Sequence, residues 1–68
     1  MKRYEITEKG TDNVVATGAA DEYGGHWTTM DPAYATPTTG LQPTPGQALD
    51  FVAALSGLEV AGLSFDWT

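Results

Sequence analysis

The sequence predicts a small single α+β domain, in which one helix packs on a three- or four-stranded, largely antiparallel sheet. Residues 2–8 and 61–67 alternate between apolar and polar side chains, as strands with one buried face do. In the first of these segments, Tyr4 and Ile6 fall on the same face. A well-defined helix start stands at Thr44. Because the chain has 68 residues, we expect one domain that spans residues 1–68.

We expect the chain to begin with a β-hairpin. Residues 9–13 are rich in Gly, Asp and Asn, which favour turns, and they follow the alternating segment 2–8. The β-branched residues 14–17 then form the second strand. Residues 18–20 are small, so they either form a bulge within a long second strand or begin a loop.

A second turn and a third strand follow. Gly24-Gly25 predicts a two-residue hairpin turn of type I′, since both central positions of that turn need a positive φ. Residues 26–30 form the third strand, which places Trp27 and Met30 on opposite faces. Residues 31–43 contain three prolines and no periodic pattern, and we expect them to form a loop.

The strongest local pattern predicts the helix, and the last strand follows it, giving the order β-β-β-α-β. Thr44 suits the N-cap, Pro45 the first helical position, and Gln47 completes a capping box. Gly57 stands where helices end in the left-handed conformation. An apolar stripe at helical spacing predicts the buried face of the helix: Ala48, Leu49, Val52 and Leu55, widened by Phe51. The side chains expected to pack beneath it come from the last strand: Ala61, Leu63, Phe65 and Trp67.

The charge distribution narrows the classes of partner. The net charge is −6, and the three basic residues all lie within the first nine positions: Lys2, Arg3 and Lys9. This balance disfavours direct binding to nucleic acids and to anionic membranes, which need several cations. It is compatible with a basic protein partner, or with a charge that only keeps a small domain soluble. Because so small a core gives limited stability, a homodimer is also possible.

Composition also bears on the compartment. The chain has no cysteine, which excludes disulfides and thiolate metal sites. It shows neither a secretory signal nor an apolar run of the length that a membrane span needs. We therefore expect a cytoplasmic protein without a membrane partner.

The segment Asp21–Tyr34 holds the one histidine of the chain, but its residues do not match a metal or catalytic site. One His with several carboxylates is a poor set of zinc ligands, and the acids lack the spacing of an EF-hand. His26 could act as a base, yet neither Ser56 nor Ser64 lies in a nucleophile-elbow sequence. No phosphate-binding glycine motif is present. We expect no catalytic residue, no bound metal, no cofactor and no enzymatic activity.

The same segment is better suited to binding a protein. Aromatic residues and methionine are enriched at interface cores, and here they alternate with acids. Since the two faces of the third strand cannot belong to one patch, we take the turn and the flank of the loop as the candidate partner-binding surface: Asp21, Glu22, Tyr23, His26 and Tyr34. The alternative is that these side chains mainly pack the fold.

The element order, together with TPGQAL at the helix start, is similar in outline to HicB-type antitoxins, in which a related Thr-Pro-x-x-Ala-Leu opens the helix. The chain also resembles phage-encoded inhibitors, including anti-CRISPR proteins, in size and charge. The leading hypothesis is a non-enzymatic inhibitor or adaptor that occludes a basic, nucleic-acid-handling protein. The alternatives are a small-ligand-binding or self-associating structural module, or a HicB-like antitoxin.

Overall fold

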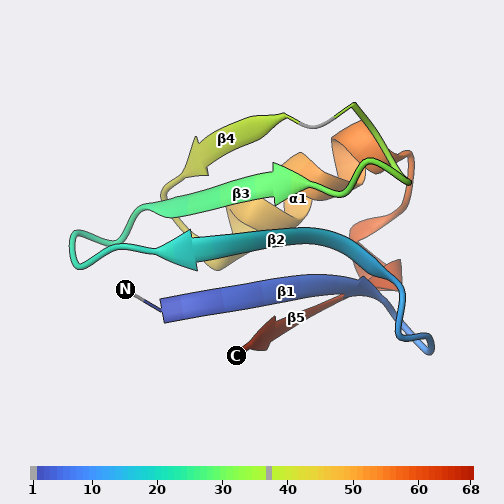
Figure 1. Cartoon of the computed structure of the whole chain (residues 1–68), viewed down its shortest axis with the longest axis horizontal. Coiled ribbons are helices and arrows are strands. Elements are labelled where there is room, and N and C mark those ends of the chain that lie inside the picture. The colour runs from blue at the N-terminus through green and yellow to red at the C-terminus, as the bar shows by residue number, and fades with distance from the viewer. Residues whose placement is uncertain (1, 37) are drawn as a thin grey trace.

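One helix packs against one face of a five-stranded antiparallel sheet, in which the strands follow the order β4-β3-β2-β1-β5 (Figure 1). The computed structural model describes residues 2–36 and 38–68. The elements are β1 (Lys2–Glu8), β2 (Val14–Ala20), β3 (His26–Met30), β4 (Thr39–Gln42), α1 (Pro45–Ser56), a 3₁₀ turn η1 (Val60–Gly62) and β5 (Leu63–Trp67). The predicted fold class is thus confirmed, with one strand more than expected.

The additional strand is β4, which lies within the segment predicted to be a loop. Leu41 pairs with Trp27 and Thr39 with Thr29, so β4 extends the sheet beyond β3. A Cβ atom on Gly40 would lie 2.7 Å from the Phe51 ring of α1, which explains why a residue without a side chain stands there. A strand of four residues between two prolines is too short for a periodic pattern to reveal it. Its formation also depends on pairing with residues that are distant in sequence.

The first hairpin forms as predicted, and β2 continues without a break to Ala20. Ile6 pairs with Ala16 whereas Thr7 pairs with Val14, so Val15 is the extra residue of a bulge. One of the two alternatives expected from the sequence was a bulge at the small residues 18–20. The bulge instead lies before them, at Val15. It explains why Val15 and Ala16, although adjacent, are both fully buried.

The helix begins and ends where the sequence predicted. The backbone N–H of Gln47 donates to the Thr44 hydroxyl at 3.2 Å. Gly57 ends the helix with φ of 77°, and its N–H donates to the Ala53 carbonyl oxygen. The buried face is narrower than expected, because it centres on Ala48 and Val52.

Three residues expected in the core lie largely outside it. Leu55 is exposed in the last turn of α1, and Ala61 is exposed in η1. Trp67 is half-exposed because β5 is an edge strand. Leu63 and Phe65 do pack against the core, as predicted.

The Tyr4 side chain joins four of the five strands. It is 1% exposed, and its ring passes over Gly18 of β2 to place the phenol oxygen 2.5 Å from the Thr28 hydroxyl of β3. On the other side its ring stacks on Phe65 of β5, with the ring centroids 4.6 Å apart. Burial raises the pKa of Tyr4 from its ordinary value, although the hydrogen bond with Thr28 acts in the opposite direction.

Gly18→Ala should destabilise the fold, because the new methyl group would overlap the Tyr4 ring and the Trp27 carbonyl oxygen. We expect a loss of about 1–3 kcal/mol in the free energy of unfolding, measured by urea denaturation. Gly62→Ala is the matched control, because nothing lies within 4 Å of the position that its new methyl group would occupy. Equal stability of the two variants would contradict the role of Gly18.

Candidate protein-binding surface

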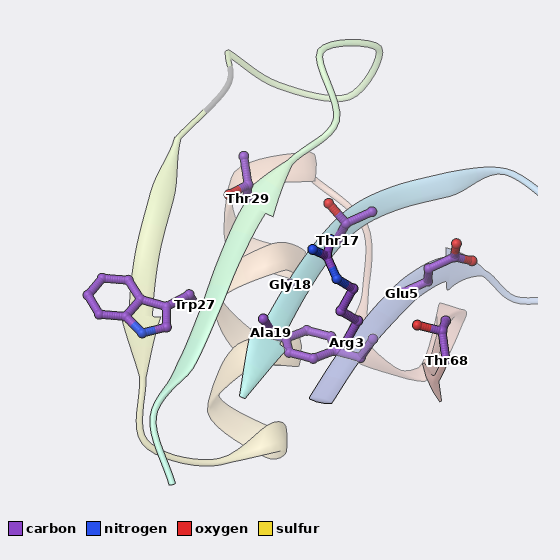
Figure 2. A pocket seen from close by; sticks show the side chains of 9 residues that line it. Arg3, Glu5, Thr17, Gly18, Ala19, Trp27, Thr29 and Thr68 are labelled. Atoms are coloured by element: carbon purple, nitrogen blue, oxygen red, sulfur yellow. The ribbon is translucent and has the colours of Figure 1, made fainter. Parts of the chain in front are cut away.

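The helix covers one face of the sheet and leaves the other face open. The covered face carries Tyr4, Ile6, Ala16, Thr28 and Met30, all of which are buried. The open face has a shallow depression of about 420 Å³. In Figure 2 the Arg3 side chain extends over β2 toward Thr17, and Trp27 points away from both, toward β4. The middle of the open face therefore combines polar and apolar surface, and the large exposed apolar side chains of this face lie at the β3–β4 side.

Apolar side chains gather at the corner of the sheet where β3 begins and β4 ends. Tyr23 is 89% exposed, Leu41 53% and Trp27 46%. Trp27 and Leu41 are direct partners across β3 and β4, and both lie on the open face. Tyr23, Leu41 and Pro43 line a depression of about 380 Å³ beside them. We call Tyr23, Trp27, Leu41 and Pro43 the corner patch.

The turn that presents Tyr23 is held by the carboxylate of Asp21. Its Oδ1 atom accepts hydrogen bonds from the backbone N–H groups of Tyr23 and Gly25, each at 2.9 Å. The Gly24 N–H donates to the Asp21 carbonyl oxygen at 3.2 Å, and Gly24 has φ of 88°. The predicted type I′ turn at Gly24-Gly25 is wrong. Only the first of these glycines has a positive φ, because the Asp21 carboxylate organises a longer connection of residues 21–25.

The five residues predicted to bind a partner do not form one surface. Asp21, Glu22 and Tyr23 lie together at this turn, and Tyr23 belongs to the corner patch. His26 points to the helix side of the sheet and is 6% exposed. Tyr34 lies beyond Met30, at the end of β3 opposite the turn of residues 21–25. Binding by any of the five stays a prediction, but the structure divides them into a group of three at the turn, in which Asp21 is half-buried and Glu22 and Tyr23 are exposed, and two separate side chains.

The surroundings of His26 and Tyr34 give both residues structural contacts. The His26 ring lies beside both Tyr4 and Trp67, with centroid distances of 6.0 and 6.1 Å, and its buried Nδ1 has no hydrogen-bond partner among the described residues. The half-buried Tyr34 donates its hydroxyl to Oε2 of Glu8 at 3.3 Å. Burial, followed by the negative charge of Glu8, raises the pKa of Tyr34.

Sequence reasoning missed three members of the corner patch: Trp27, Leu41 and Pro43. The alternation of β3 placed Trp27 on the face opposite His26 but gave no indication of which face the helix would cover. Leu41 lay in the segment taken for a loop. The alternation of Thr39 and Leu41 was a signal for its exposure, although a strand of four residues makes that signal weak.

This surface offers two kinds of contact, apolar and charged. The patch supplies aromatic and aliphatic area, and the adjacent turn supplies two carboxylates. Ser64 donates to Asp66 on the face opposite His26, and Ser56 donates to the Ala53 carbonyl oxygen within α1. In the part of the chain that the structure describes, no three His, Cys, Asp or Glu side chains are grouped as metal ligands.

Two further findings concern the chain as a whole. Within residues 2–36 and 38–68, no helix has the length and apolar character needed to cross a membrane. Comparison with known proteins finds no matching family model, no matching curated protein and no matching solved structure. The likeness to HicB-type antitoxins therefore stays a resemblance in outline.

Asp21→Ala should loosen the turn that carries Tyr23, because two backbone N–H groups lose their acceptor. We expect a loss of about 1–2 kcal/mol in the free energy of unfolding and faster amide exchange at Tyr23 and Gly25. Glu22→Ala is the matched control, since this neighbouring carboxylate is exposed. An Asp21→Ala variant with the stability and exchange rates of wild type would refute this role.

Proposed function

We propose that this chain is a non-enzymatic protein-binding module, and that the corner patch is its contact surface. The observation that carries the proposal is the exposure of Tyr23, Trp27 and Leu41 at one corner of a small domain. Exposed aromatic residues are typical of interface cores, because they bury a large area at a small entropic cost, and here both lie beside Leu41. Pro43 and the turn held by Asp21 support this role, because they limit the conformations that the surface can adopt before it binds a partner.

The chemistry of the partner follows from the charges around the patch. Asp21 and Glu22 flank it, and no Lys or Arg occurs anywhere from residue 10 to residue 68. Two cations also lie near this end of the sheet: Lys2 lines a neighbouring depression together with both acids, and Arg3 lines the open-face depression that Trp27 borders. With a net charge of −6, the protein attracts a basic partner over long range, and the two carboxylates select for Lys or Arg around the apolar contact.

A basic surface is common among proteins that handle nucleic acids, because it neutralises the phosphates. We therefore propose that the module acts as an inhibitor or adaptor that occludes such a partner, in the cytoplasm. Occlusion requires only binding and charge complementarity, and it needs neither the buried His26 nor either serine.

The test compares proteins captured from the source cells by wild type and by Tyr23→Ser/Leu41→Ser. Val60→Ser is the matched control, because Val60 is exposed on η1 and lies outside the patch. All three proteins are first shown to have the same circular dichroism spectrum. We expect wild type and the control to capture the same basic protein at low salt. The patch variant should capture at least tenfold less of that protein. Retention by all three proteins would refute the site.

A further inference from the structure

We propose that the outer edge of β4 receives an extended basic segment of the partner, which adds to the sheet as a sixth strand beside the corner patch. This inference rests on the proposed function and specifies its binding mode. It requires that the edge offer unpaired backbone groups, that those groups lie next to the patch, and that the charges favour a basic occupant over a second copy of this chain.

The hydrogen-bond pattern shows which backbone groups of β4 point outward. The Met30 N–H donates to the Thr38 carbonyl oxygen at 3.2 Å, so these residues form a bonded pair. Bonded and non-bonded pairs alternate along an antiparallel ladder. Thr39 and Leu41, opposite Thr29 and Trp27, are therefore non-bonded positions whose N–H and C=O groups face away from β3.

These outward groups are available and lie next to the patch. In the described part of the chain, no hydrogen bond from a turn, a loop or a side chain involves the N–H or C=O of Thr39 or Leu41. Both side chains are exposed on the open face, and β4 is the outermost strand on its side of the sheet (Figure 1). A strand hydrogen-bonded there would place alternate side chains beside Leu41, in continuity with the patch.

The composition of β4 favours strand addition. Its sequence is Thr-Gly-Leu-Gln, without a charged residue. Edge strands that avoid pairing commonly carry charges, especially Lys, and this one carries none. The acids nearest the patch, Asp21 and Glu22, then favour a partner segment in which Lys or Arg alternates with apolar residues.

The other edge of the sheet suits a basic segment less well. The Leu63 N–H of β5 already donates to the Val60 carbonyl oxygen. The Lys2 ammonium group lies 5.8 Å from the centroid of the Trp67 ring, which places a positive charge at that edge. A second copy of the chain is disfavoured at β4, because each copy carries a net charge of −6 and brings the same two acids to the same corner.

The experiment uses a capped octapeptide of alternating lysine and valine as the probe, and the same peptide with glutamate in place of lysine as its control. Amide hydrogen exchange of the whole chain is followed by NMR. We expect the lysine peptide to slow exchange at Thr39 and Leu41 at least tenfold, and the glutamate peptide to leave both rates unchanged.

A pair of variants tests the backbone contact itself. Thr39→Pro removes an outward N–H without removing a bond of the β3–β4 ladder, whereas Thr39→Ala removes only the side chain and its hydrogen bond with Thr29. We expect the proline variant to bind the lysine peptide at least tenfold more weakly than the alanine variant, with the folds shown to be equal by their NMR spectra.

Several results would overturn the proposal. These are the absence of peptide binding, equal binding of both peptides, protection at Phe65 and Trp67 in place of β4, and protection that grows with protein concentration when no peptide is present. The last result would assign the edge to a second copy. In the capture experiment, the Thr39→Pro variant could retain a partner that Tyr23→Ser/Leu41→Ser loses. That result would reject strand addition but not the proposed function. A partner kept by both variants would reject the proposed function as well.

Discussion

The fold depends on one side chain that crosses the sheet from β1 to β3. Tyr4 can reach Thr28 only because Gly18, on the intervening strand, has no side chain beneath its ring. The same ring contacts Phe65 and Trp67 of β5, so a single residue connects the edge strand to the centre of the sheet. The chain has 68 residues and no cysteine, so no disulfide links its strands. A buried aromatic residue with a hydrogen-bonded hydroxyl supplies part of the stabilisation that disulfides give other small domains.

The position of Tyr4 also determines which surfaces remain available. Its ring and α1 close one face of the sheet, and His26 is buried there with them. Trp27, the next residue, must then point to the open face, where it meets Leu41. The alternation of side chains along β3 therefore determines both the core and the proposed binding surface, because it buries His26 and Thr28 and exposes Trp27. Strand β4 adds Leu41 and an unpaired edge to that surface.

The sequence was sufficient to predict the elements that are specified locally. The cap at Thr44, the left-handed Gly57 and the alternation of Tyr4 with Ile6 each depend on residues close in sequence, and all three predictions were confirmed. The candidate site was predicted only in part, because β4 forms by pairing with β3 and the exposed face of Trp27 is decided by where the helix packs. His26 looked like a surface residue for the same reason, since its burial comes from Tyr4 and Trp67, which are distant in sequence.

A double-mutant cycle of Tyr4→Phe and Thr28→Val tests the central contact most directly, with the free energy of unfolding measured in urea. Each single change leaves the other hydroxyl buried without its partner, at a cost of about 1–3 kcal/mol, whereas the double change removes both hydroxyls. The structure predicts that the double variant is more stable than the sum of the single losses implies, by at least about 1 kcal/mol. Additive losses would show that the two hydroxyls do not act together and would contradict this account of the fold.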